Sequence, residues 1–179
     1  SDGGPLGMVI DFSKAGTVAG KVTTYKKQTA TKLERLTPET YGAIASKLAK
    51  TDNGNDRVVS QLLFICNPTD YLTKVMPATT LLNTNGAYVK DVFPFPTEVV
   101  ISNEVATGKA ILCLPNEYFM AMGGAKEGVI EYSKDFQFLD DATTYKIKTY
   151  GNGKCTDNTC SLLLDISGLE EAVIYTKVK

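Results

Sequence analysis

Two residue types are missing from the 179 residues of this sequence: it contains no histidine and no tryptophan. Without histidine there is no Ser-His-Asp or Cys-His pair, no pair of histidines on a zinc-binding helix and no imidazole general base. Without tryptophan, carbohydrate binding through ring stacking is disfavoured. No apolar run approaches the roughly 18 residues needed to cross a bilayer, so the sequence predicts no membrane partner.

The sequence also lacks an excess of charge of either sign. Lys and Arg total 19 and Asp and Glu total 20, which gives a formal net charge of −1. Such a chain has no overall basic footprint for nucleic acid, so contact with DNA is expected to be non-specific only. A chain of this size buries roughly 70% of its extended surface. The sequence therefore predicts one domain, or one domain with a small annex, whose core needs no disulfide or metal.

Residues 62–71 form the most distinctive local pattern. The five apolar residues 62–66 are typical of a strand covered on both faces. Asn67 is a good helix N-cap, and Pro68, which cannot donate a hydrogen bond to a sheet, suits the first turn of a helix. The pattern predicts a strand over about 58–66 that turns directly into a helix over about 68–75. The corner has neither a nucleophile nor glycines, so it indicates architecture rather than chemistry.

The remaining elements predict an α+β fold. A helix is expected to start at Pro38, with Thr37 as its N-cap, and to end in a turn at 53–55. Its apolar face comprises Tyr41, Ile44, Ala45 and Leu48. Short strands are predicted over 88–95, 98–101, 110–114, 129–132, 143–150, 161–166 and 173–178, with 151–160 as the tip of a long hairpin. Residues 116–122 fit either a helical turn or a strand. Strands and helices mix without regular alternation, which favours a mixed central sheet with flanking helices.

The four cysteines fall into two groups. Cys66 and Cys113 lie in apolar runs and are expected to be buried thiols. Cys155 and Cys160 flank a Thr-Asp-Asn-Thr turn, and this spacing leaves two alternatives open: reduced thiols or a local cross-strand disulfide. A four-cysteine zinc site needs two close pairs, and the sequence has one.

Three further patterns partly match ligand sites. Residues 52–56 are rich in oxygen ligands, but their glycine is misplaced for a calcium-binding EF-hand loop, and a helix-ending turn is predicted instead. Residues 151–154, Gly-Asn-Gly-Lys, lack the Ser or Thr and the helix that complete a phosphate loop. Asp135, Asp140 and Asp141 have no indicated pocket or cation nearby and are interpreted as solvated turn charges. The sequence thus predicts no catalytic, cofactor or metal site.

Five segments, taken in order, resemble one protein family. They are residues 1–8, 64–71, 83–88, 95–100 with 108–111, and 131–147. The first, Ser-Asp-Gly-Gly-Pro-Leu-Gly-Met, resembles the segment that follows the spine helix in the major capsid protein of tailed bacteriophages, the Hong Kong 97-like fold. The second, Phe-Ile-Cys-Asn-Pro-Thr-Asp-Tyr, resembles the strand-to-helix corner of that family's axial domain. Order and spacing, rather than any single motif, carry the resemblance, which covers essentially the whole chain.

The resemblance implies a domain organisation. The chain would be the C-terminal part of a longer subunit, without the N-terminal arm, extended loop and spine helix. Residues 1–27 would be a peripheral-domain remnant, 28–141 the axial domain and 142–179 the return strands of the peripheral domain. The implied fold is the mixed central sheet with flanking helices plus a small β-hairpin extension. Its landmarks in this sequence are Asn67, Pro68 and Asp70.

The resemblance also implies a function. The chain would be a non-enzymatic structural subunit of an icosahedral phage or prophage capsid, assembled in the cytoplasm of a bacterial host and without a cofactor. Its partners would be copies of itself, as pentamers and hexamers in full-length form, whereas the present chain is expected to be monomeric or weakly associated. The residues expected at the capsomer interface are Tyr88, Lys90, Asp91, Phe93 and Phe95. Alternatively, Phe93 and Phe95 fill the core.

Three other functions compete with this interpretation. An encapsulin-type shell subunit shares the fold and would differ at the N-terminus and in its enzyme cargo. A secreted, non-catalytic β-rich binding module would have a Cys155–Cys160 disulfide. A hydrolase that uses Asp135 or Asp140 would need a deep acidic pocket, and the absence of histidine disfavours it most.

Overall fold

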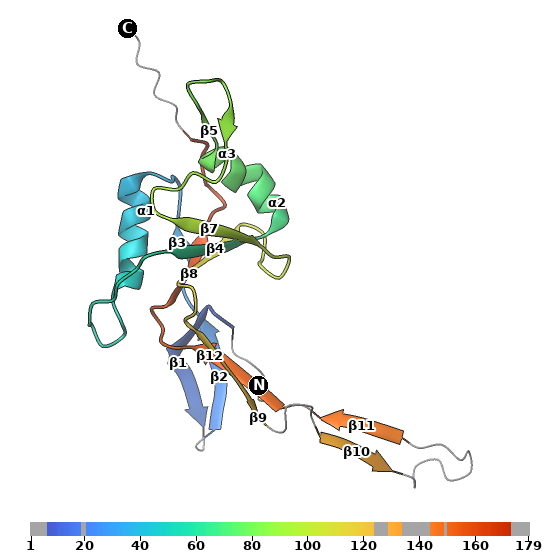
Figure 1. The fold of residues 1–179 in the computed structure, drawn as a ribbon. Helices are drawn as coiled ribbons and strands as arrows, with labels where there is room; N and C mark the ends of the chain where they lie inside the picture. The colour runs from blue at the N-terminus through green and yellow to red at the C-terminus, as the bar shows by residue number, and fades with distance from the viewer. Residues whose placement is uncertain (1–6, 19–20, 124–128, 134–143, 149, 173–179) are drawn as a thin grey trace.

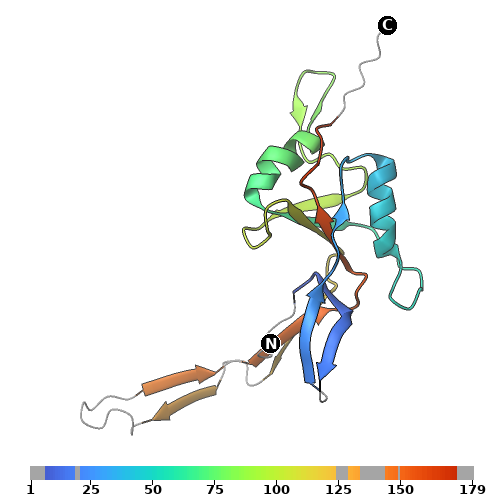
Figure 2. The ribbon, with the colours of Figure 1, turned by 180° about the vertical axis from the view of Figure 1, so that it is seen from behind.

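The computed structural model describes residues 7–18, 21–123, 129–133, 144–148 and 150–172. It is elongated, with a central body of helices and a sheet (Figure 1). The small hairpin of β5 (Leu81–Leu82) and β6 (Tyr88–Val89) lies at one end, and two-stranded ribbons extend from the opposite side. The view from behind shows the same order of parts along the molecule (Figure 2).

The central sheet has five strands in the order β3-β13-β8-β4-β7. Their bounds are Thr31–Lys32, Ser161–Asp165, Lys109–Cys113, Leu62–Cys66 and Thr97–Ile101. β4 runs parallel to β7 and β13 runs parallel to β3, whereas β8 is antiparallel to both β4 and β13. This mixed sheet, flanked by helices, confirms the predicted α+β class. It also confirms the predicted strands that became β7 and β8.

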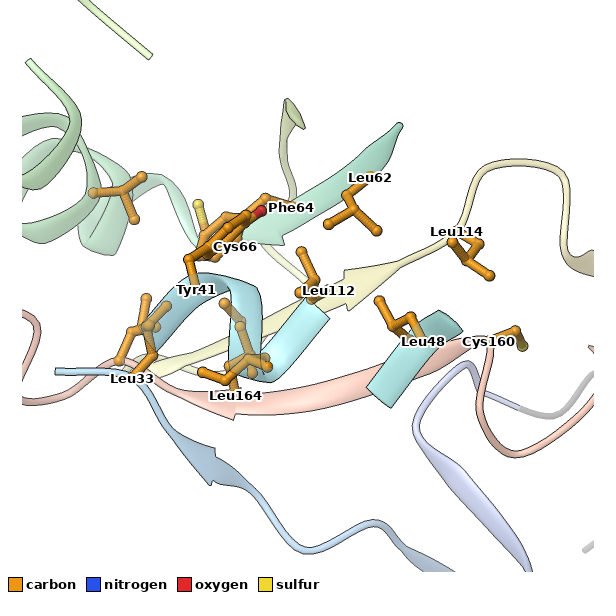
Figure 3. Packing of buried hydrophobic residues seen from close by; sticks show 14 of the residues in the cluster. Leu33, Tyr41, Leu48, Leu62, Phe64, Cys66, Leu112, Leu114, Cys160 and Leu164 are labelled. Carbon is orange, nitrogen blue, oxygen red and sulfur yellow. The ribbon is translucent and has the colours of Figure 1, made fainter. Parts of the chain in front are cut away.

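One face of this sheet forms the core. Side chains alternate along β4, so that Leu62, Phe64 and Cys66 are fully buried whereas Leu63 and Ile65 are half-buried. The buried partners of β4 include Leu33, Tyr41, Leu48, Leu112 and Leu164 (Figure 3). Each fully buried Leu or Phe side chain stabilises the fold by about 1.5–3 kcal/mol relative to exposure.

Helix α1 (Pro38–Ala45) begins as the sequence predicts. The Thr37 side chain accepts a hydrogen bond from Thr40 N at 3.2 Å, and Pro38 occupies the first turn. The helix ends earlier than predicted, because residues Ser46–Ala49 form a tighter 3-10 turn, η1. The predicted stop signal lies beyond both elements, where Gly54 has φ +81° in a turn that only glycine adopts without strain.

A second helical stretch follows β4 and is longer than predicted. It runs through α2 (Pro68–Asp70), the π-helical turn η2 (Tyr71–Val75) and α3 (Met76–Thr79). Pro77 lacks the N–H that would bond to the carbonyl four residues back, and its ring clashes there. The wide π turn, in which Met76 N donates to Tyr71 O, accommodates this proline.

The predicted strand over 88–95 is wrong beyond residue 89. β6 pairs with β5 for two residues only, and residues 90–96 form a loop. Asp91 has φ +56°, and Pro94 and Pro96 cannot donate to a ladder. The loop therefore leaves the hairpin and returns to the core, where Phe93 and Phe95 pack against the buried cluster.

The ribbons correct the predicted hairpin at 151–160. The strand β12 (Tyr150–Cys155) contains the glycine-rich residues that the sequence placed at a tip, and it pairs with β9 (Tyr118–Gly123) instead of preceding a turn back to β13. Residues 118–123 are thus a strand, which resolves the ambiguity at 116–122. Two further ribbons pair β1 (Ile10–Val18) with β2 (Lys21–Lys27), and β10 (Val129–Ser133) with β11 (Thr144–Lys148).

Some predictions fall outside the described residues. These are the strand over 173–178 and the aspartates Asp135, Asp140 and Asp141.

Candidate interaction surface

The strand-to-helix corner fixes the neighbouring loop 102–108. Asn67 caps α2 by accepting a hydrogen bond from Thr69 N at 3.0 Å, and its amide donates to Val105 O at 3.0 Å. Asp70 is buried, and its carboxylate accepts a hydrogen bond from Gly108 N at 2.6 Å. The corner is therefore a structural clamp between the helix and the loop that leads into β8.

The predicted interface residues separate into two groups. Phe93 is partly buried, with ring centroids 5.8 Å from Tyr41 and 5.7 Å from Phe64, and Phe95 also packs against the core. In contrast, Tyr88 is 79% exposed and Lys90 is exposed. The packing favours the alternative in which the two phenylalanines fill the core and leaves Tyr88 and Lys90 as surface residues.

Asp91 lies in the chain between the exposed Tyr88 and Lys90 and the partly buried Phe93 and Phe95. Its carboxylate accepts a hydrogen bond from the Tyr71 hydroxyl at 2.9 Å, and Val92 N donates to Thr79 O at 3.0 Å. These bonds hold the loop against the η2–α3 helical stretch. The position of Tyr88 and Lys90 is thus fixed by the bonds that Asp91 and Val92 make to the helical stretch.

A first apolar surface lies at the hairpin end of the molecule. This apex patch consists of Met76, Leu81, Leu82, Tyr88 and Val89, all exposed by more than a third. A hollow of ≈ 570 Å³ beside it is lined by the α3 turn, Tyr88, Lys90, Glu171 and Ala172. Because these exposed apolar residues gather at one place, the apex patch is a candidate interaction surface.

A second apolar surface lies on the β9–β12 ribbon, on the other side of the body (Figure 1). Phe119 and Met120 are 63% and 59% exposed. Because successive side chains of a strand point to opposite faces, both faces of this ribbon carry an exposed apolar residue. We call these two residues the ribbon patch. Sequence reasoning missed it because the signal, two adjacent apolar residues, is equally typical of a buried strand.

The four cysteines are free thiols and are buried. Burial raises the pKa of Cys66 and of Cys113 to about 11, as predicted for thiols in apolar runs. Cys155 and Cys160 lie at the two ends of a turn, between β12 and β13.

Within the described residues, no group of three or more Cys, Asp or Glu side chains is placed to hold a metal ion. The oxygen-rich segment at 52–56 is a turn, closed by a hydrogen bond from Gly54 N to Thr51 O and by a Lys50–Asp56 ion pair of 2.6 Å. No helix in the described part of the chain has the length and apolar character to span a membrane.

Comparison with known proteins finds similarity among solved structures. No protein-family model matches the sequence, and no curated protein matches it. Among solved structures, a chain from the crystal structure of a virus-like particle from Pyrococcus furiosus is similar over 76% of this chain, with 12% sequence identity and a TM-score of 0.40. The matched region spans 56% of that neighbour's chain.

Proposed function

We propose that this chain is a structural subunit of a protein shell and acts by binding copies of itself. The observation that carries the proposal is the presence of two separate apolar surfaces, the apex patch and the ribbon patch, on opposite sides of an elongated body. Exposed apolar residues that gather as in the apex patch are typical of protein–protein contacts, and the ribbon offers one such residue on each of its faces.

Two different surfaces suit two levels of assembly. A single contact repeated around an axis closes into a ring and then stops. A second, distinct contact is needed to join rings to one another and close a shell. In this proposal the apex patch, with Tyr88 and Lys90, forms the ring contact, and the ribbon patch forms the contact between rings.

The finer proposal rests on the sequence resemblance. The Asn67–Pro68 corner and the four other matched segments support a subunit of a phage or prophage capsid with the Hong Kong 97-like fold. In that proposal the full-length subunit forms pentamers and hexamers, assembles in the bacterial host cytoplasm and touches packaged DNA only non-specifically. Residues 28–141 correspond to the axial domain, flanked by peripheral-domain segments at 1–27 and 142–179.

Electron microscopy of the product of the complete gene tests this function. We expect closed particles of uniform size. Sedimentation velocity of the 179-residue chain alone, over a wide concentration range, is expected to show a monomer or a weak, concentration-dependent oligomer. A complete gene product that stays monomeric at high concentration would overturn the proposal.

A further inference from the structure

The chain crosses between the body and the β9–β12 ribbon through two short segments, 114–117 and 156–160, which we call the joint. Cys155 is the last residue of β12, and Cys160 directly precedes β13. Both side chains are buried, with exposed fractions of 4% and 1%. The two thiols therefore mark the beginning and the end of the return crossing.

The two sulfur atoms lie within a small set of shared contacts. Cys155 Sγ donates to Met8 O at 3.5 Å and lies 3.9 Å from Ser161 Oγ. Cys160 Sγ donates to Asp157 O at 3.0 Å. Cys155 thus contacts the side chain of the residue that follows Cys160, which places the two cysteines at the same end of the turn.

The turn between them is held in place from outside. Arg57 reaches over from the body, and its Nη2 lies 3.0 Å from Asp157 Oδ2 and 2.7 Å from Thr159 Oγ1. Asn158 N donates to Asp52 Oδ2 at 3.1 Å. Since these bonds do not involve sulfur, the turn keeps the cysteines close whether or not they are bonded.

The thiols also differ in acidity. The neighbouring Cys155 lowers the pKa of Cys160 below the ordinary value of a thiol, whereas the pKa of Cys155 is raised. A thiolate is the attacking form in thiol–disulfide exchange. Cys160 is therefore the nucleophile of the pair, and Cys155 the resolving thiol.

We propose that Cys155 and Cys160 are a dithiol site that small-molecule disulfides oxidise to an intramolecular disulfide at the joint. The Cys160 thiolate attacks one sulfur of the small disulfide, which releases one small thiolate and leaves a mixed disulfide on Cys160. Cys155 then gives its proton to the released thiolate and attacks Cys160 Sγ, which expels the second small thiolate. That thiolate takes from the solvent the proton that Cys160 released when it ionised. Two protein thiols are oxidised, and one small disulfide is reduced to two small thiols.

The consequence is a covalently closed joint. Oxidation adds a covalent link across the turn between β12 and β13, beside the bonds from Arg57 and Asp52. A disulfide lowers the conformational entropy of the unfolded chain. For so short a loop in a chain of this size, it should raise Tm by about 4–8 °C. Cys66 lies on β4, away from the turn, whereas Cys113 on β8 pairs with Ser161 and is therefore a neighbour of Cys160.

Equilibration of the protein with glutathione and glutathione disulfide, over a range of redox ratios, tests the proposal. After acid quenching and denaturation, we expect the free-thiol count to fall from four to two as the buffer becomes oxidising. Trypsin cleaves after Lys154 and Lys177, so one peptide carries both Cys155 and Cys160 and should become lighter by two hydrogen atoms.

Three variants sharpen this test. Cys155→Ser and Cys160→Ser should each abolish the loss of two thiols and the rise in Tm, whereas Cys66→Ala should retain both. A count that stays at four in the most oxidising buffer would overturn the proposal. So would a bond mapped to Cys66 or Cys113, or a covalent dimer on a non-reducing gel. Each outcome is independent of whether the chain forms a shell.

Discussion

At the scale of single residues, the buried carboxylate of Asp70 has the clearest structural role. It accepts a hydrogen bond from Gly108 N and lies 3.4 Å from Lys74 Nζ, one helical turn further along. Gly108 has φ +77°, and its carbonyl accepts a hydrogen bond from Ile166 N. One carboxylate therefore links the corner helix, the loop before β8 and the end of β13.

Asp70→Ala should lower the free energy of unfolding by about 1–3 kcal/mol, because it leaves the buried Gly108 N–H without its acceptor. Asp70→Asn keeps one acceptor oxygen and should lower the free energy of unfolding by less. The matched control is Asp56→Ala, which removes an exposed carboxylate paired with Lys50 and should leave stability unchanged. Urea denaturation followed by circular dichroism measures all three, and equal losses for Asp70→Ala and Asp56→Ala would contradict the role of Asp70.

A second carboxylate, Asp165, makes folding stability depend on pH. Hydrogen bonds from Lys109 Nζ at 2.7 Å and from Ser167 lower the pKa of Asp165 far below its ordinary value. A carboxylate with a depressed pKa in the folded state contributes its stability above its unfolded pKa of about 4 and loses it as the pH falls further.

Stability should therefore decline below about pH 4–5, and Asp165→Asn should show a shallower decline than the unchanged protein. Tm measured from pH 7 to pH 2.5 checks this. Glu104→Gln, which alters an exposed carboxylate, serves as the control and should retain the original slope. Parallel curves for Asp165→Asn and the unchanged protein would contradict the prediction.

At the scale of elements, the β9–β12 ribbon depends on a glycine beneath an aromatic ring. A Cβ at Gly153 would lie 2.8 Å from the Tyr118 hydroxyl and 3.1 Å from Phe119 O. The Tyr118 ring thus occupies the space that a side chain would need. At Gly151, two residues away on the same strand, a Cβ would approach only Ala121 O, at 3.9 Å.

Gly153→Val should destabilise the ribbon by about 1–3 kcal/mol through overpacking. Gly151→Val should be neutral or slightly stabilising, because valine favours strands and has room there. Amide hydrogen exchange over residues 118–123 and 150–155 measures local opening of the ribbon. Similar protection in both variants would show that the ring does not restrict Gly153.

At the scale of the whole molecule, the two apolar patches should govern different stages of assembly. The double variant Leu82→Ser and Tyr88→Ser removes the apex patch and should leave the complete gene product as monomers. The double variant Phe119→Ser and Met120→Ser should stop at ring-sized oligomers. Each double substitution should raise the dissociation constant of the affected contact about tenfold or more.

Analytical ultracentrifugation and electron microscopy distinguish these stages. The control is Val58→Ser, which removes a side chain that is 95% exposed and lies outside both patches. It should assemble normally. Closed particles from either double variant would remove that patch from the assembly pathway.

Much of the local structure could be predicted from the sequence. The caps at Thr37 and Asn67, the proline that follows each, and the short apolar runs of β7 and β8 could be recognised from neighbouring residues, because capping and strand patterns act over a few positions. The mixture of such elements also predicts the α+β class. The balanced charge and the absence of histidine likewise follow from the composition alone.

Tertiary structure alone decided which segments pair and which side chains face water. Gly-Asn-Gly-Lys reads as a turn, yet it is part of β12 because Tyr118 of the distant strand β9 covers Gly153. Phe93 and Tyr88 look alike in sequence, yet the loop that Asp91 ties to Tyr71 buries the first and exposes the second. The physical reason is that strand pairing and burial are contacts between residues far apart in the chain, which no local pattern specifies.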